Sequence, residues 1–303
     1  MKSVSYLRLL ALAAGMSLLM NCAAVQEGIS TVSGGKISKS DAEAAVKVGK
    51  AFRDSFEDIN ESEEYYIGRA VAALVLSKYP VYQNETLTAY INKIGNSVAV
   101  YSDRPEIYAG YHFLILDTDE VNALSAPGGF IFITKGLLKR CRNEEMIGNI
   151  LAHEVAHVAA KHGLKSIKKS RLIDAFKIMG TEAAKKYGPQ ELSELTAVFE
   201  GVLSDIVENL IERGYDRKYE YEADQQGVKS AAGTGYDPKG MADFLKTMVD
   251  DSAGQSGKGW FKTHPSAQDR LGKVSTQISS IKPLPGEQKV RTSRFVQTVK
   301  GLK

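Results

Sequence analysis

The sequence feature that most constrains the fold is an apolar stretch at residues 149–163, which reads NILAHEVAHVAAKHG. Good helix formers dominate it, and Gly163 stands where a helix is expected to end. His153 and His157 are four residues apart, so on a helix both imidazoles can point at one ion. Glu154 is rotated about 100° from His153 and can flank that ion without competing for it.

This spacing is the H-E-x-x-H pattern, in which two histidines bind zinc and the glutamate is the general base for an attacking water. The alternative is a partly exposed helix with two solvated histidines and a surface glutamate. Apolar residues flank the pattern: Ile150, Leu151, Val155, Val158 and Ala159. They predict a largely buried helix, and buried polar groups need partners. We therefore expect a metal ion here.

A stable zinc site needs a third protein ligand. The pattern H-E-x-x-H-x-x-G-x-x-H would supply a third histidine, but its Gly and His positions hold Ala160 and Gly163. His162 lies about 140° from His157 around a regular helix, so it cannot join the same ion. We expect it to make a mostly structural interaction at the helix C-terminus.

A second helix offers a carboxylate ligand. Residues 217–224 read RKYEYEAD, and Glu220 and Asp224 share one helix face. That spacing suits a ligand plus a carboxylate that orients a ligating histidine, although a solvated acidic face has the same spacing. Glu222 is turned about 200° from Glu220, so the two cannot bind one ion together. Periodicity alone does not exclude Glu222 as the ligand.

The remaining pattern predicts a mainly α fold with a small β-sheet (α+β). The expected helices cover residues 41–56, 62–78 with Ser62 as the cap, 84–101, a start at 135–140, the metal helix capped by Asn143, 168–212 broken at 188–189, and 266–278. The expected strands cover 111–117 and 130–134, separated by a turn-rich passage at 122–129.

Pro127, Gly128 and Gly129 lie between the two expected strands and fit a sheet edge or a sharp bend. An edge beside a metal site can hold an extended peptide by strand addition, which would make the two glycines substrate-binding. A simple hairpin connection is an equally good interpretation.

The N-terminus resembles a secretory signal. Residues 1–21 hold a short basic region and an apolar run that is too short for a convincing membrane span. The following LLMNCAA resembles a bacterial lipobox with lipid on Cys22, although Asn21 departs from the usual small residue and ordinary cleavage nearby is the alternative. Ala23 in place of Asp favours the periplasmic face of the outer membrane.

The expected domains are a signal peptide (1–21), a flexible tether (22–40), one catalytic domain (41–285) and a C-terminal tail (286–303). Loss of the signal removes two positive charges and takes the formal net charge from +3 to +1, which gives no support for nucleic acid binding. If Cys22 carries lipid, Cys141 is left alone and no disulfide framework exists.

In combination these motifs resemble the gluzincin metallopeptidases, in particular the HtpX and CAAX-prenyl-protease family, metallopeptidase family forty-eight. The resemblance is carried by His153-Glu154-x-x-His157 and Glu220-x-x-Ala223-Asp224, with Asn122-Ala123, Pro127-Gly128-Gly129 and Thr263-His264-Pro265. It covers about residues 62–280. It implies a zincin-like metalloprotease fold built around the H-E-x-x-H helix.

The resemblance also implies roles for single residues. One zinc ion per chain would be bound by His153, His157 and Glu220, with Glu154 as the base and Asp224 supporting a ligating histidine. His264 would reach the metal or stabilise the transition-state oxyanion. Arg270 would hold a substrate carboxylate or an acidic neighbour; the alternatives are a histidine near a helix cap and a surface arginine.

The implied function is that of a zinc endopeptidase of the bacterial periplasm, anchored by lipid alone. Its partners would be unfolded or misassembled envelope proteins. The rival is a zinc-stabilised chaperone or scaffold whose cleft stays closed. Residues 165–212 are long enough to cover the site, and the glycine-rich 254–259 stretch could be a mobile flap.

Overall fold

The computed structural model describes residues 59–166, 204, 206–251, 260–264, 267–281, 288–299 and 302. By its internal contacts the chain divides into Met1–Ile59 and Asn60–Lys303, and the fold below is that of the second unit. The signal, the tether, the helix expected over 41–56, most of the 168–212 region and the 254–259 stretch lie outside the described residues. They stay predictions.

A three-stranded sheet has the order β1-β3-β2. β1 (His112–Leu116) pairs parallel to β3 (Phe130–Thr134), and β2 (Ala123–Ala126) pairs antiparallel to β3. The two expected strands are confirmed, but β2 occupies part of the passage expected to be turn. Its four residues, ALSA, are small and lack the β-branched residues that mark a strand. Only Pro127–Gly129 (η1) forms the turn.

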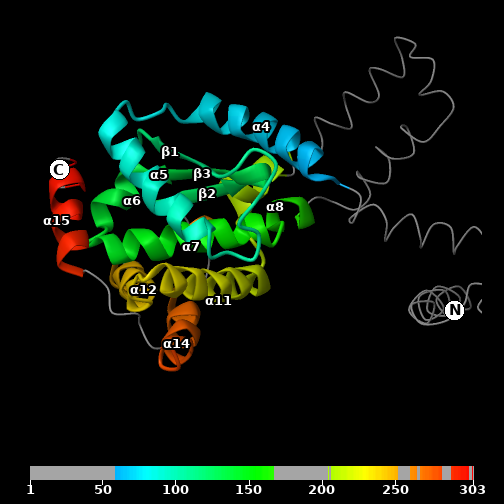
Figure 1. The fold of residues 1–303 in the computed structure, drawn as a ribbon. Coiled ribbons are helices and arrows are strands. Elements are labelled where there is room, and N and C mark those ends of the chain that lie inside the picture. Colours follow the sequence, from blue (N-terminus) through cyan, green and yellow to red (C-terminus); the bar gives the residue numbers. More distant parts are fainter. Residues whose placement is uncertain are drawn as a thin grey trace, which may run out of the picture. The chain divides into compact units, whose positions relative to one another are not determined.

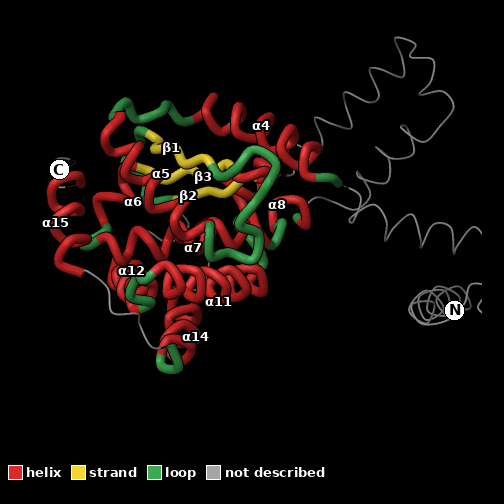
Figure 2. Tube along the Cα trace, viewed as in Figure 1, coloured by secondary structure: helices red, strands yellow, loops and turns green. Residues whose placement is uncertain are grey.

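Helices make up most of the described fold (Figures 1 and 2). They are α4 (Glu61–Lys78), α5 (Glu85–Ala99), α6 (Lys135–Arg140), α7 (Glu144–Ala159), α8 (His162–Lys165), the π-helix η3 (Asn209–Arg213), α11 (Arg217–Thr234), α12 (Lys239–Asp251), α13 (Trp260–Thr263), α14 (Ala267–Ile278) and α15 (Gln288–Val299). Among the described helices, none combines the length and the apolar character needed to cross a bilayer. The α+β class predicted from the sequence is confirmed.

Helix α7 is the centre of the fold. It runs between the sheet and α11, and all of its residues are buried (Figure 1). The predicted cap is confirmed, since the Asn143 side chain accepts a hydrogen bond from the Met146 amide at 2.9 Å. Ser62 as the cap of α4 was wrong: α4 begins at Glu61, and the Ser62 hydroxyl instead donates to Asn60 Oδ1 at 2.6 Å.

The end of α7 differs from the sequence-based expectation. The helix stops at Ala159, and Lys161 takes the left-handed conformation at φ 56° and ψ 34°. A lysine there lacks the conformational freedom of glycine, so other contacts must hold it. Lys161 Nζ lies 3.3 Å from the buried Glu64 carboxylate of α4. Gly163, expected to end the helix, instead lies within α8.

The glycines of η1 serve close packing. Gly128 and Gly129 have φ of 68° and 93°, and both are buried. A Cβ on Gly128 would lie 2.5 Å from Tyr65 Cα of α4, and one on Gly129 would lie 2.6 Å from the Gly110 carbonyl. The structure therefore gives both glycines packing contacts. The strand at the edge of the sheet beside the site is β2.

The segment expected to be a tail contains α15, which packs on α5 and α7. Arg294 Nε donates to Glu144 Oε2 at 2.8 Å, and Arg291 Nε donates to Glu145 Oε1 at 2.6 Å. The hydroxyls of Tyr90 and Tyr236 also donate to Glu144, at 2.8 and 3.1 Å. The first turn of α7 is thus a buried, charge-paired junction.

Replacement of Glu144 by glutamine should lower the free energy of unfolding by about 2–4 kcal/mol, because several hydrogen bonds to a buried charge are weakened at once. Urea unfolding measures the change. Glu85→Gln is the control, since Glu85 occupies the same first-turn position on α5 but is exposed. Equal midpoints for the two variants would mean that the junction contributes nothing.

Candidate metal centre

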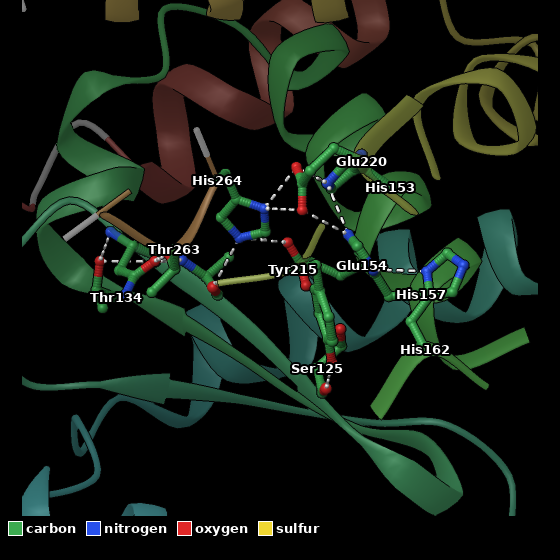
Figure 3. A network of polar contacts seen from close by, with 12 residues as sticks. Ser125, Thr134, His153, Glu154, His157, His162, Tyr215, Glu220, Thr263 and His264 are labelled. Carbon is green, nitrogen blue, oxygen red and sulfur yellow. Dashed lines mark hydrogen bonds and ion pairs between the residues drawn. The ribbon is translucent and has the colours of Figure 1, made fainter. Parts of the chain in front are cut away.

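Four side chains from three parts of the fold converge on one point at α7. They are His153 and His157 of α7, Glu220 of α11, and His264, which directly follows α13. One ligand atom from each lies within 4.8 Å of the other three, and all four residues are buried (Figure 3). The two histidines and the carboxylate expected to meet across two helices are therefore brought together.

The spacing of these atoms fits a small tetrahedral ion. The Nε2 atoms of His153 and His157 are 3.1 Å apart, and they lie 3.6 and 3.4 Å from the Glu220 oxygens. Ligands bound tetrahedrally at 2.0–2.1 Å from zinc are separated by roughly 3.3 Å. Of the two carboxylates that periodicity left open, the structure places Glu220 here, whereas Glu222 contacts His162.

The charge of the site also favours a cation. Glu154, Glu220 and Asp224 are buried carboxylates, and Arg270 supplies a buried guanidinium beside them in the described part of the chain. With neutral histidines, the form that binds a metal ion, this leaves a formal charge of minus two. Neither oxygen of Glu154 has a hydrogen-bond partner among the described residues. Because a buried carboxylate without hydrogen bonds is costly, this arrangement fits a divalent cation nearby.

Residues of α11 and α14 fix the orientation of His153 through its Nδ1 side. Its Nδ1 lies 3.0 Å from Asp224 Oδ1, which leaves Nε2 facing Glu220. Arg270 Nε and Nη2 bind the Asp224 carboxylate at 2.8 and 2.7 Å, and Nη1 lies 2.8 Å from Glu220 Oε2. Gly227 lets α11 approach, since a Cβ there would lie 2.8 Å from the His153 amide nitrogen. Arg270 thus contacts acidic neighbours and is fully buried.

The same contacts set the ionisation of the acids. Burial opposes the charge on Glu220, but His264, Arg270 and the hydrogen bonds from both α7 histidines outweigh it and hold its pKa well below the usual value. Burial likewise opposes ionisation of Asp224, and Arg270 and His153 lower its pKa nonetheless. Both acids are therefore carboxylates at neutral pH, as metal binding and histidine orientation require.

His264 sits on the opposite side of the Glu220 carboxylate. Its ring stacks on Trp260 with centroids 4.0 Å apart, and Nδ1 lies 3.0 Å from Glu220 Oε2. Its Nε2 lies 3.7 Å from Glu154 and 3.4 Å from the Ala123 carbonyl of β2. This position suits both roles expected for it, a further ligand or a group facing the reacting carbonyl.

Two site residues were missed or misread from the sequence. Tyr215 was not singled out, yet its ring stacks on His157 at 4.4 Å and its hydroxyl donates to the Ser125 carbonyl at 3.3 Å. Burial and Glu154 raise its pKa, so it is a neutral phenol. His162, expected to interact only at a helix end, lies 2.9 Å from His157 Nδ1. Burial lowers its pKa to about 2, so its ring is neutral.

Comparison with known proteins agrees with this geometry. Residues 85–278 match the model of "Peptidase family M48". The chain belongs to this family. The family predicted from the combined motifs is thereby confirmed, and the described α+β fold is consistent with the zincin-like fold expected for an M48 member.

Three relatives illustrate the similarity. The Beta-barrel assembly-enhancing protease of Escherichia coli (strain K12) is 23% identical over 80% of this chain and 52% of its own length. Metalloprotease YcaL of the same organism is 25% identical over 90% of this chain and 98% of its own length. The Mitochondrial metalloendopeptidase OMA1 of Schizosaccharomyces pombe is 27% identical over 73% of this chain and 63% of its own length. The chain spans about half the length of the beta-barrel assembly-enhancing proteases it matches.

Proposed function

We propose that this M48 member is a zinc-dependent endopeptidase that hydrolyses peptide bonds with Glu154 as the general base. One observation carries the proposal: three potential ligands converge from α7 and α11 beside a buried carboxylate without a hydrogen-bond partner. The ligand set of two histidines and one glutamate is a catalytic rather than a structural zinc set, because it leaves a coordination position open.

His153, His157 and Glu220 would hold the ion. When bound, zinc supplies a Lewis acid that polarises a substrate carbonyl and acidifies a water molecule. The remaining work falls to the protein. Glu154 accepts the proton of the attacking water and passes it to the leaving amine. Asp224 and Arg270 keep His153 oriented, and His264 faces the region where negative charge develops on the carbonyl oxygen.

The proposed location is the bacterial periplasm, with Cys22 as a lipid anchor on the outer membrane. The basis is the lipobox-like N-terminus, together with the similarity to proteins named beta-barrel assembly-enhancing protease. The proposed substrates are unfolded or misassembled envelope proteins, whose extended segments can pair with a sheet edge.

Metal content and proteolysis, measured together, test the proposed activity. The purified full chain should contain one zinc ion, digest casein, and lose that activity in a chelator. Full zinc content without cleavage would contradict the endopeptidase and favour the rival, a zinc-stabilised scaffold.

One observation favours the rival scaffold function: the site is closed in the described part of the chain. The carbonyls of Ala123 and Ser125 lie along the edge strand β2, where an extended peptide would bond. Both are occupied by side chains of the protein itself: His264 contacts the first and Tyr215 the second. The cavity between β2, Glu154 and Tyr215 has a volume of only about 10 Å³. Substrate entry therefore requires these side chains to move.

Tyr215→Phe should raise the rate of casein cleavage at low substrate concentration by roughly 2–10-fold. The variant keeps the ring on His157 and removes one hydrogen bond that holds the site closed, worth about 0.5–1.5 kcal/mol. Initial rates of both proteins at equal zinc content give the answer. A decrease would show that the phenol assists the reaction, and no change would show that it does not hold the site closed.

A further inference from the structure

His162 and Glu222 form a chain of contacts that ends on a metal-binding histidine. His162 Nδ1 lies 2.9 Å from His157 Nδ1, and His162 Nε2 lies 3.3 Å from Glu222 Oε2. His162 is fully buried, whereas the Glu222 side chain is 41% exposed. This series of contacts therefore runs from the surface, through the buried ring of His162, to Nδ1 of His157, which does not face Glu220.

The backbone places His162 there against helical expectation. On a regular helix this residue would point about 140° away from His157. The left-handed Lys161 ends α7, and α8 begins at His162, which turns the ring back over the preceding helix. The Lys161–Glu64 ion pair ties this turn to α4. The position of His162 is thus built by contacts from two other helices.

One set of ring protons satisfies both contacts and leaves His157 able to bind a metal ion. A carboxylate oxygen of Glu222 can only accept, so His162 donates from Nε2. Of the two Nδ1 atoms that face each other, one must donate, and His157 must do so if its Nε2 is to keep the lone pair that a metal ion needs. The Nε2 lone pair of His157 is then free and faces His153 Nε2 and Glu220. We assign these tautomers from the contacts.

The two α7 histidines have matched but different supports. Asp224, held by Arg270, lies against Nδ1 of His153. His162, held by Glu222, lies against Nδ1 of His157. Helix α11 thus contributes the candidate ligand Glu220 and one carboxylate for each histidine. The second support differs in passing through another imidazole.

We propose that His162 and Glu222 are positioning residues that fix the tautomer and ring orientation of His157 for metal binding. This inference rests on the proposed metal site. Partners of this kind that hold the far nitrogen of a ligating histidine typically change metal affinity by about 10–100-fold when they are removed. A purely structural histidine would affect folding and leave metal affinity unchanged.

Zinc affinity, measured by competition with a chromophoric chelator, tests the proposal on the full chain. His162→Phe keeps a ring but removes the acceptor, and we expect zinc affinity to fall about 10–100-fold. His162→Asn can place an amide oxygen near the Nδ1 position, and we expect it to recover part of that loss. Gln225→Ala, at an exposed position of α11, is the control and should bind zinc like the wild type.

The outcomes separate this inference from the proposed function. Tight zinc binding by wild type and by His162→Phe alike would overturn the positioning role of His162. It would leave the proposed endopeptidase activity unaffected. Absence of zinc binding by the wild type would overturn both. Equal loss in the Phe and Asn variants would show that ring packing, and not the acceptor, matters.

If His162→Phe does not fold, NMR of the imidazole nitrogens of the zinc-loaded wild type tests the proposal instead. We expect His157 to be protonated on Nδ1 and His162 on Nε2. A proton on His162 Nδ1 would overturn the proposed positioning role.

Discussion

Glu154→Gln should lower the rate of casein hydrolysis by about 10²–10⁴-fold while zinc content stays at one ion per chain. Glutamine has the shape of glutamate but cannot take a proton from water at neutral pH. Zinc should be retained because Glu154 is not among the four ligand-bearing residues that converge. Loss of the Glu154 carboxylate should not destabilise the fold, since neither of its oxygens has a hydrogen-bond partner among the described residues.

Initial rates of purified wild type and variant, together with zinc analysis of the same samples, measure this effect. Glu85→Gln, an exposed glutamate on α5, controls for the loss of a surface charge and should cleave like the wild type. Wild-type rates in Glu154→Gln would exclude this residue as the base. Loss of zinc along with activity would mean that Glu154 acts on the ion itself.

Glu220→Gln should lower zinc affinity more than 100-fold and abolish cleavage, because a ligand is lost and not merely a supporting group. The change also deprives the buried Arg270 of one of its two carboxylate partners. A ligand that binds only the folded state adds about 2.7 kcal/mol of stability at 100 times its dissociation constant. Zinc should therefore raise the melting temperature of the wild type and leave that of the variant nearly unchanged.

Thermal melts with zinc and with a chelator, on both proteins, measure this linkage. The same melts on Glu85→Gln should show the wild-type response. A variant that keeps the full zinc-dependent shift would remove Glu220 from the ligand set.

Local sequence pattern was enough to predict the centre of this fold. The four-residue spacing of His153 and His157, the apolar flanks and the Asn143 cap are properties of one continuous helix. Glu220 and Asp224 were paired by the same periodicity on α11. These predictions needed no knowledge of how distant parts of the chain meet.

Features that depend on distant contacts were not predictable in this way. The position of His162 follows from a left-handed Lys161, which is paired with Glu64, a residue almost one hundred positions earlier. Tyr215 carries no periodic pattern, and only the fold brings it onto His157 and β2. Glu144 and Glu145 in the first turn of α7 pair with arginines of α15, about 150 residues later, and no local pattern indicates this contact.

Anomalous diffraction at the zinc absorption edge, from crystals of the zinc-loaded protein, locates the ion itself. We predict a single strong peak about 2.0–2.2 Å from the Nε2 atoms of His153 and His157 and from a carboxylate oxygen of Glu220. A peak elsewhere, or a Glu220 carboxylate beyond bonding distance of the ion, would contradict the claim that one cation joins α7 to α11.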